Sequence, residues 1–466
     1  MMKQQLVKAY LKLPPLVQNV LVSLYGIKLY VERYGVGRRA AEKMLKNSES
    51  YSFSEMERLQ EDAFVDLAHY AIDNVPFYIE WAKNKGISKS NISSIDDLSL
   101  FPVIEKEMIR DSPSSFVSKK YRNKKLISLS TSGSTGSPLE IYTDNHTRTL
   151  HYAFFTRLRS WFGVEKRGGR ATFLGRIVVP QGQKRPPFWR YDFGQNNLLM
   201  STYHLSEDNL SSYIEKLTAY RPVEIFGHPS SIYRVANYII DNDSCGKVKP
   251  NVVITTAETL MPYQRTAIEK AFDCPVVDQY GCTEMAFFAS QCESGEMHFH
   301  PEHAIIEIVD SKNCIVKPGV RGQLVATSLI SKVMPLIRYK VGDTLSVSEE
   351  KSKCHPGFPI IKFLEGRTDD LVYKKDGGSV GRLSPIFRSD KNVTLSQITQ
   401  EESGDITVLV VPNEKYNDKN REMIRRELVE RVGDDLNISI FEVESIPKEK
   451  NGKFRPVKSY YKRIVD

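Results

Sequence analysis

The sequence is poor in cysteine and has no apolar run near its N-terminus long enough for a membrane span. Six cysteines at irregular spacing among 466 residues do not form the disulfide framework of a small secreted domain. We therefore expect a reducing, cytoplasmic environment. The mildly apolar stretch 16–27 contains Gln18, Asn19 and Ser23, and no small-residue cleavage site follows it. It predicts a surface helix packed on the body of the protein, with contact to a membrane surface as the alternative.

The chain also lacks a strong excess of charge of one sign. Its 65 Lys and Arg residues against 57 Asp and Glu residues give a net charge of +8, spread along the sequence. The basic run at 119–125 reads as a solvated loop, because no nucleic-acid-binding motif accompanies it. We therefore expect no nucleic-acid partner, and a mild positive balance suits small anionic substrates equally well.

The length of 466 residues and the hydrophobic fraction of 41% are those of a globular protein with two to four domains. Apolar residues at helical spacing predict a helix over 56–71, ending before Val75-Pro76. Residues 143–161 are predicted to form another helix, which begins near Asp144. Strand and helix patterns then alternate, which favours α/β layering with parallel strands. The predicted strands are 171–179, 223–226, 252–256 and 275–278, with helices near 210–217, 232–240 and 264–272. Residues 181–190 are predicted to form a long loop.

The pattern changes after Tyr280. Short strands separated by turns are typical of antiparallel β structure, and they are predicted at 304–309, 322–327 and 344–347. After Gly366 a smaller α+β unit is predicted, with strands at 406–411 and 438–443 around a helix near 423–428. We therefore predict two domains. Residues 1–366 form a large layered α/β domain with a β-rich subdomain, and residues 367–466 form a small mobile α+β domain.

A loop rich in Ser, Thr and Gly at 130–138 follows the apolar run 126–129. Glycine lets a backbone approach a bulky anion, and successive N–H groups and hydroxyls can surround a phosphate. No Lys-Ser or Lys-Thr follows the last glycine, so the loop is not a Walker A loop. On composition alone, an ordinary solvated loop is an equal alternative.

Four further stretches follow this loop in a particular order: Asp278 to Glu284, Arg338 to Asp343, Gly366 to Asp370, and Pro447 to Arg455. Together the five stretches resemble the adenylate-forming (acyl-CoA synthetase-like) superfamily, over nearly the whole chain. Within it, the chain resembles the phenylacetate–CoA ligase and capsular polysaccharide biosynthesis group, through the stretches 75–78, 101–103, 187–190 and 227–230.

The resemblance implies an ATP-dependent ligase. A carboxylate attacks the α-phosphate of ATP, giving an acyl-adenylate and pyrophosphate, and an acceptor then displaces AMP. The acceptor is CoA, or an amine or hydroxyl of a sugar or amino acid, and the process is cell-surface or capsular polysaccharide biosynthesis. A phenylacetate-type aryl-acid CoA ligase is one alternative, and a nucleotide-binding scaffold without turnover is another. The required cofactors are ATP and Mg²⁺.

The resemblance also implies which residues bind the nucleotide. Because two anions must approach one another, preorganised donors and cations have to neutralise their repulsion. Thr283 is expected at the α-phosphate and Glu284 at Mg²⁺, a cation that takes few protein carboxylates. Asp343 is expected to accept both ribose hydroxyls. The β- and γ-phosphates are assigned to Ser132, Gly133, Ser134, Thr135 and Gly136. The adenine is assigned to Ala257, Glu258, Tyr280 and Gly281, and a further ribose or phosphate contact to Arg367.

Three other roles follow from the resemblance. Lys453 matches the catalytic lysine, whose ammonium group bridges the carboxylate and the α-phosphate. Asp369 stands at the hinge about which the small domain rotates between two half-reactions. His228 is expected to shape the acyl pocket, since an ionised carboxylate needs no general base. The sequence departs from the usual pattern at Pro138-Leu139-Glu140, where many relatives place a lysine after the proline.

Cysteine and histidine are enriched in two nearby stretches around residues 292–303 and 354–355. Cys292, His298, His300 and Cys354 are candidate ligands of a structural Zn²⁺. His303 and His355 lie in the same stretches. The spacing matches no standard zinc motif, so ordinary thiols and histidines are the alternative.

Overall fold

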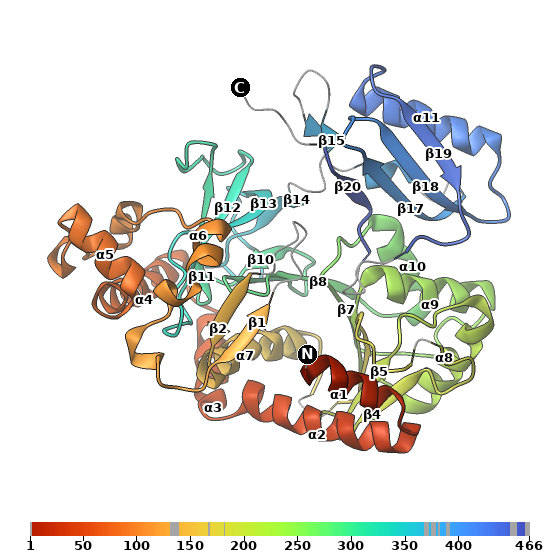
Figure 1. The fold of residues 1–466 in the computed structure, drawn as a ribbon, viewed down its shortest axis with the longest axis horizontal. Helices are drawn as coiled ribbons and strands as arrows, with labels where there is room; N and C mark the ends of the chain where they lie inside the picture. Colours follow the sequence, from red (N-terminus) through yellow and green to blue (C-terminus); the bar gives the residue numbers. More distant parts are fainter. Residues whose placement is uncertain are drawn as a thin grey trace.

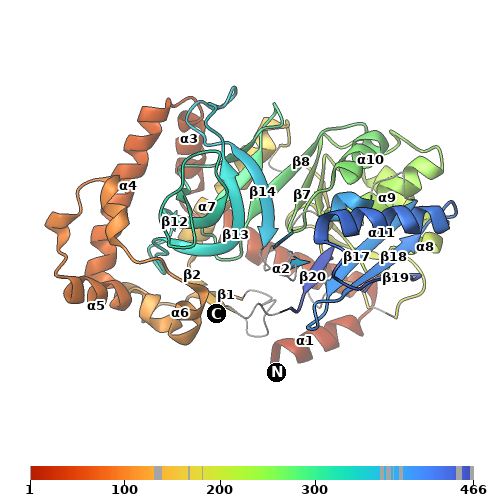
Figure 2. The ribbon, with the colours of Figure 1, turned by 90° about the horizontal axis from the view of Figure 1, so that it is seen from above.

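The computed structural model of the chain describes residues 2–130, 139–165, 168–180, 182–367, 372–373, 379–380, 383–387, 392–447 and 454–461. A central eight-stranded sheet, a four-stranded antiparallel sheet and a separate C-terminal unit make up most of it (Figure 1). The C-terminal unit lies beside the half of the large domain that carries α8 to α10, and the antiparallel sheet lies on the other side (Figure 2).

The central sheet confirms the predicted α/β layering. Its strand order is β10-β9-β8-β7-β6-β3-β5-β4, in which neighbours among β5, β3, β6, β7 and β8 pair in parallel, whereas β4 pairs antiparallel with β5, β9 with β8, and β10 with β9. The strands are β3 (Arg170–Phe173), β4 (Trp189–Asp192), β5 (Asn197–Met200), β6 (Glu224–Gly227), β7 (Val252–Thr256), β8 (Val276–Gly281), β9 (Phe288–Gln291) and β10 (Met297–Phe299).

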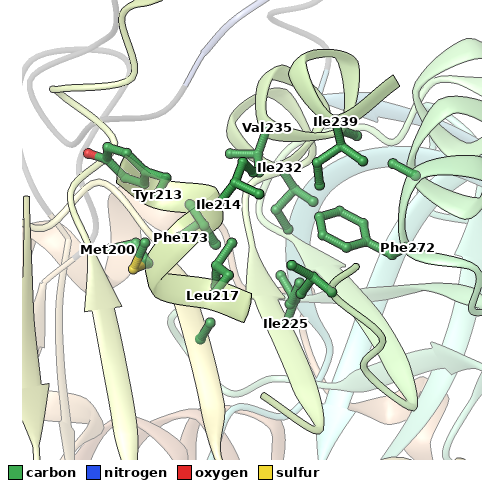
Figure 3. Packing of buried hydrophobic residues seen from close by; sticks show 14 of the residues in the cluster. Phe173, Met200, Tyr213, Ile214, Leu217, Ile225, Ile232, Val235, Ile239 and Phe272 are labelled. Carbon is green, nitrogen blue, oxygen red and sulfur yellow. The ribbon is translucent and has the colours of Figure 1, made fainter. Parts of the chain in front are cut away.

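Helices cover both faces of this sheet. On one face α8 (Glu207–Tyr220), α9 (Pro229–Asp241) and α10 (Pro262–Phe272) pack on alternate strand residues such as Ile225 and Val253 (Figure 3). On the other face α7 (Asn145–Trp161) and α3 (Arg38–Ser48) pack on Val252 and Ile254. Burial of both faces explains why the central strands read as continuous apolar runs. The predicted start of α7 is confirmed, because the Asp144 side chain accepts a hydrogen bond from the Thr147 amide.

Two predictions around β3 and β4 are wrong. The predicted strand 171–179 ends at Phe173, because its neighbour β6 ends at Gly227. Residues 174–179 therefore extend past the end of β6 and are not paired with a strand. The predicted loop 181–190 ends too late, since Trp189 and Arg190 belong to β4. Arg190 is buried, with its guanidinium 2.5 Å from the Gln18 side-chain oxygen and 2.9 Å from the Pro187 carbonyl.

The antiparallel sheet has the order β11-β12-β13-β14 and confirms the predicted change of pattern after Tyr280. Its strands are β11 (Ala304–Val309), β12 (Gly322–Ser328), β13 (Tyr339–Val347) and β14 (Ile361–Arg367). β13 begins five residues before the predicted strand 344–347 and so includes most of the third stretch. The hairpin β1 (Ile127–Ser130) and β2 (Glu140–Thr143) brackets the Ser/Thr/Gly loop, whose residues 131–138 lie outside the described residues.

The N-terminal third is largely helical. Its helices are α1 (Met2–Leu11), α2 (Pro15–Tyr34), α3, α4 (Phe53–Asn74), α5 (Pro76–Lys85) and α6 (Lys106–Asp111), with short 3₁₀ turns at Lys89–Asn91, Ile95–Leu100, Pro113–Phe116 and Lys119–Tyr121. The helix predicted over 56–71 is confirmed as α4. In the described part of the chain, no helix has the length and apolar character that crossing a membrane requires.

The C-terminal unit has its own core, in which Ile398, Val408, Ile424 and Leu428 are fully buried. It combines α11 (Asp418–Val432) with the sheet β19-β18-β17-β20 and confirms the predicted α+β character. Its strands are β15 (Val372–Tyr373), β16 (Ser379–Val380), β17 (Val393–Gln400), β18 (Ile406–Pro412), β19 (Ile438–Glu442) and β20 (Val457–Ser459), with a 3₁₀ turn at Ser384–Phe387. Residues 368–371 are not described, so the boundary at 366/367 stays a prediction.

Candidate active site

The candidate site lies where three parallel strands end. β6, β7 and β8 are adjacent and paired in register, so the loops that follow them start at the same sheet edge. Ligands of open α/β sheets bind at the carboxyl ends of such strands. His228 follows β6, Ala257 and Glu258 follow β7, and the second stretch begins in β8. The fold therefore brings together residues that are about fifty positions apart in the sequence.

Glu258 connects this edge to the C-terminal unit. Its side chain is 4% exposed, and its Oε1 accepts a 2.7 Å hydrogen bond from the Phe454 amide. The same oxygen lies 3.6 Å from His228 Nδ1, and Oε2 accepts from the Ser230 amide at 3.2 Å. Phe454 follows Lys453 directly. The fifth stretch thus ends against the carboxylate that follows β7.

Gly227 places His228 at this edge. A Cβ at Gly227 would lie 2.2 Å from the carbonyl oxygen of Phe173 in β3, a contact that backbone atoms cannot relieve. Glycine at the end of β6 therefore allows β3 and β6 to approach closely. His228 then precedes α9 and is 3% exposed, with its imidazole facing Glu258.

Tyr280 and Asp343 meet across the two sheets. The Tyr280 hydroxyl, at the end of β8, donates to Asp343 Oδ2 in β13 at 2.5 Å. Asp343 is 7% exposed and pairs in register with Arg367 of β14, whose side chain is not described. Three of the five stretches therefore supply residues to one place.

Glu284 is held in a similar way. Its buried Oε1 accepts a 2.8 Å hydrogen bond from the Tyr339 hydroxyl at the start of β13. Thr283 and Gly281 are exposed beside it. A buried carboxylate next to an exposed hydroxyl is an oxygen-donor set that fits Mg²⁺. Burial, followed by the Glu284 charge, raises the pKa of the Cys282 thiol well above its usual value, which excludes a thiolate nucleophile there.

Asp278 begins the second stretch and is half-buried in β8. Burial raises the pKa of its carboxyl group to about 7, although the Thr255 hydroxyl donates to its Oδ1 at 2.7 Å. The Asp278 amide donates to Gln291 Oε1 in the neighbouring β9. Asp278 thus stabilises the β7–β8–β9 pairing from inside the sheet.

The chain is similar in sequence to a protein of a named family over nearly its whole length. It is 31% identical to Protein CapK of Staphylococcus aureus over 447 residues, which cover 95% of this chain and 96% of that protein. The chain belongs to the CapK family. Residues 372–460 of this CapK-family chain match the model of the CapK C-terminal domain. Phenylacetate-coenzyme A ligase of Aromatoleum evansii is 26% identical over 344 residues, which cover 70% of this chain and 74% of that enzyme.

Among solved structures, 2-hydroxyisobutyryl-CoA ligase in its postadenylation state with 2-HIB-AMP has a TM-score of 0.71 and 18% identity, covering 89% of this chain and 91% of that one. The same ligase in its thioesterification state, over the same coverage, has a TM-score of 0.58. The overall arrangement here is therefore closer to the first form. The predicted superfamily and fold class are confirmed, and the CapK-family chain is an enzyme of the adenylate-forming ligase class.

Several predicted site residues lie outside the described residues of this CapK-family structure. They are Ser132, Gly133, Ser134, Thr135 and Gly136 of the first loop, Asp369 of the hinge and the predicted catalytic Lys453. The flanking residues are described. Ser130 and Glu140 pair across the hairpin that carries the loop, and Glu140 accepts from the Tyr142 hydroxyl at 2.9 Å.

The predicted zinc set needs one correction. Both ring nitrogens of His300 have other partners: Nε2 lies 2.9 Å from the Ser290 hydroxyl, and Nδ1 lies 2.5 Å from the Arg157 guanidinium. Arg157 is also paired with buried Glu302. His300 is therefore part of a buried ion-pair network, and Glu296 takes its place in the cluster with Cys292, His298 and Cys354.

Two residues at the site were not predicted. Tyr339 holds Glu284, and Phe454 presents its amide to Glu258. Both lie inside stretches that the sequence singled out. The role of Phe454 belongs to its backbone amide, which its side-chain type does not indicate, and only the fold shows that the Tyr339 hydroxyl contacts Glu284. A cavity of about 620 Å³ between α3, α4 and α7, lined by residues such as Leu45, Leu59 and Phe154, shares no residue with this site. We assign the chemistry to the strand ends because the polar groups converge there.

Proposed function

We propose that this enzyme activates a carboxylate with ATP, releases pyrophosphate, and transfers the acyl group from the acyl-adenylate to an acceptor in the synthesis of a capsular polysaccharide. The observation that carries the proposal is the hydrogen bond from the Phe454 amide to Glu258. It brings the fifth stretch to the strand ends, where Tyr280 is hydrogen-bonded to Asp343 of β13 and Glu284 to Tyr339 of the same strand. The relation to Protein CapK supports the capsular role.

In the proposed complex the adenosine lies between the ends of β7 and β8 and the strand β13. The Tyr280 ring stacks on the adenine, while its hydroxyl orients the Asp343 carboxylate. Asp343 accepts hydrogen bonds from the ribose hydroxyls, a task for which a carboxylate is suited because it has several acceptor sites. Ala257 and Glu258 border the adenine edge, and Arg367 adds a contact from β14.

The phosphates would extend toward the loop at 131–138, with Ser132, Ser134 and Thr135 at the β- and γ-phosphates. Thr283 would contact the α-phosphate, and Glu284 would hold Mg²⁺, which neutralises phosphate charge when it is bound. The hydrogen bond from Tyr339 keeps the Glu284 carboxylate oriented in its buried position. Because Glu284 is already oriented, it needs no reorganisation when it takes up the cation. A preorganised site of this kind lowers the cost of bringing a carboxylate to a phosphate.

Lys453 is proposed to bridge the attacking carboxylate and the α-phosphate. Its neighbour Phe454 is bound to Glu258, so the fifth stretch reaches the strand ends without a further movement of the small domain. The acyl group would lie near His228, whose buried imidazole faces Glu258. Rotation of the small domain about Asp369 would then remove the lysine and admit the acceptor.

The acceptor is CoA or an amine or hydroxyl of a sugar or amino acid. The test is carboxylate-dependent exchange between pyrophosphate and ATP with aryl acids, amino acids and sugar acids, followed by AMP release with each acceptor class. Exchange that Lys453→Ala abolishes supports the proposal. AMP release with CoA and aryl acids alone would favour the phenylacetate-type alternative. Tight ATP binding without exchange for any acid would favour a scaffold without turnover.

We also propose that α1 and α2 rest on an anionic membrane surface. Two uncharged polar residues of α2 face the protein body: Asn19 accepts from the Tyr191 amide, and Ser23 accepts from the Phe193 amide. The apolar residues face outward instead, with Leu16 79% and Leu24 59% exposed. The exposed residues of this face also include Leu6, Val7, Leu13, Val17, Val20, Leu21, Ile27 and Val31. Exposed Lys8, Lys12 and Lys28 supply a charge that complements acidic headgroups.

Sedimentation with vesicles of phosphatidylglycerol and phosphatidylcholine tests this surface. The wild-type chain should bind, with an affinity that falls as salt rises, and the double variant Leu16→Glu, Leu24→Glu should remain in the supernatant. Phe441→Glu, which changes a similarly exposed side chain in β19, is the matched control and should bind normally. Absence of binding to vesicles, or a dimer that the double variant dissociates, would overturn the proposal.

A further inference from the structure

A compact group of metal-binding side chains lies outside the candidate active site. It consists of Cys292, Glu296, His298 and Cys354, whose ligand atoms all lie within 4.8 Å of one another. Cys292 Sγ is 2.7 Å from Cys354 Sγ and 3.3 Å from His298 Nε2. Cys354 Sγ is 3.6 Å from His298 Nε2 and 3.8 Å from Glu296 Oε2. We propose that these four residues bind one structural Zn²⁺.

The chemistry of the four donors favours zinc. Two sulfur atoms, one imidazole nitrogen and one carboxylate oxygen are all ligands that Zn²⁺ takes, and four of them complete its tetrahedral shell. Thiolate ligands disfavour Ca²⁺ and Mg²⁺, which prefer oxygen. Tetrahedral bonds of about 2.3 Å to sulfur set two thiolates about 3.8 Å apart, so zinc binding requires the two cysteines to separate by about 1 Å.

The donors come from two parts of the chain that the fold brings together. Cys292, Glu296 and His298 belong to the turn and strands of the β9–β10 hairpin at the edge of the central sheet. Cys354 lies in the connection between β13 and β14 of the antiparallel sheet. Backbone bonds already join these parts: His298 pairs with Ile360, and the Phe299 amide donates to the Pro359 carbonyl at 3.0 Å.

Burial and supporting hydrogen bonds fit a closed structural site. Cys292 is 2% exposed and His298 is fully buried. The Ser352 hydroxyl donates to Glu296 Oε2 at 3.0 Å and accepts from the Cys354 amide at 3.3 Å. Partners of this kind orient metal ligands. A disulfide between the two cysteines would use the sulfur atoms alone and leave the convergence of His298 and Glu296 unexplained.

The position of the group explains what zinc would contribute. β9 follows the turn that carries Glu284 and leads into Cys292, while Cys354 lies in the connection before β14, which ends at Arg367. A metal bound by the two cysteines would therefore tie together the segments that carry Glu284 and Arg367. Zinc would therefore hold the edge of the central sheet against the antiparallel sheet. This role is independent of whether the proposed adenylation occurs, and metal binding can be measured without substrate.

The test is the zinc content of the purified full-length protein, measured by mass spectrometry of the metal. We expect about one Zn²⁺ per chain in the wild type, and a loss of at least tenfold in occupancy for Cys292→Ser and Cys354→Ser. Cys314→Ser, which removes an exposed cysteine, is the matched control and should retain full occupancy. Glu296→Gln should bind zinc more weakly than the wild type.

A second measurement on the wild type avoids variants that fail to fold. After zinc is removed with a chelator, Co²⁺ should restore an absorption spectrum with thiolate-to-metal charge transfer and the intense bands of a tetrahedral site. Reactive thiols should increase by two when the metal is removed. A protein that binds neither Zn²⁺ nor Co²⁺, or an intact mass two hydrogens lower that shows a Cys292–Cys354 disulfide, would overturn the proposal.

Discussion

At the residue scale, the hydroxyl and the ring of Tyr280 have different proposed roles, which substitutions can test separately. The hydroxyl donates to Asp343, while the ring is the proposed adenine platform. Tyr280→Phe removes one hydrogen bond to a charged group, a loss of roughly 1.5–3 kcal/mol. We expect the KM for ATP in pyrophosphate exchange to rise at least tenfold, with a smaller change in kcat.

Tyr280→Ala, which removes the ring as well, should raise the KM further than Tyr280→Phe. Tyr142→Phe is the control, because its hydroxyl donates to Glu140 on the neighbouring hairpin. An unchanged KM for ATP in Tyr280→Phe would show that Asp343 is oriented without this hydroxyl.

Glu258 offers a test of the contact between the two domains. Its Oε1 accepts from the Phe454 amide at 2.7 Å, and a carboxylate accepts more strongly than a neutral amide. Glu258→Gln keeps the shape but not the charge. We expect exchange activity to fall about tenfold, and Glu258→Ala to lower it about a hundredfold, because an unpaired buried amide costs more.

Thermal unfolding of the full-length protein should change little in Glu258→Gln, so the readout is the rate of exchange at saturating ATP. Glu269→Gln is a suitable control, since Glu269 lies on α10 and pairs with Arg265 on the protein surface. Equal rates for wild type and Glu258→Ala would contradict the proposed adenylation arrangement.

Asp278 predicts a dependence of stability on pH. Burial raises its folded-state pKa to about 7 from the ordinary value of 3.8. Because the folded state binds the proton more tightly than the unfolded state, this group makes the free energy of unfolding decrease as pH rises from about 4 to about 7. Above pH 7 the folded protein carries an ionised, half-buried carboxylate.

Asp278→Asn removes this pH-dependent contribution to the free energy of unfolding. Its free energy of unfolding in urea should exceed that of the wild type at pH 8, by a margin that shrinks toward pH 5. An advantage that is the same at both pH values would show that Asp278 does not titrate in this range.

At the element scale, the position of β6 depends on one glycine. Gly227→Ala would place a Cβ against the Phe173 carbonyl in β3, and neither backbone can move without breaking the sheet. We expect a loss of more than 2 kcal/mol in the free energy of unfolding, consistent with overpacking at a rigid site.

Gly295→Ala is the matched control in a denaturant titration. Gly295 has a φ of +82° and no atom within 4 Å of its added Cβ, so only backbone strain of about 1 kcal/mol is expected. If both substitutions cost the same, the close approach of β3 and β6 would not be the reason for glycine at 227.

Elements with strong local patterns were predictable. The spacing of apolar residues and Val75-Pro76 located α4, and Asp144 located the start of α7. The strand prediction over 171–179 was wrong because pairing partners decide where a strand ends. Arg190 was assigned to a loop because its charge gave no sign that Gln18 of a distant helix would pair with it.

At the scale of the whole molecule, the order of five short stretches predicted the superfamily, and the comparisons confirm it. Spacing along the chain could not show that Tyr339 would contact Glu284, or that Glu296 rather than His300 would join the two cysteines. Those contacts join turns and connections to distant parts of the chain, whereas sequence periodicity reports only on neighbours within one helix or strand.

The sequence by itself determined the layered fold, the separate C-terminal unit and the residue types at the candidate site, because local periodicity and short motifs carry that information. Only the tertiary structure decided which side chains meet. The packing of the central sheet against the antiparallel sheet brings the Tyr280 hydroxyl at the end of β8 to Asp343 in β13. The position of the C-terminal unit brings the Phe454 amide to Glu258. Such contacts depend on strand register and domain position, which arise from packing across the whole chain.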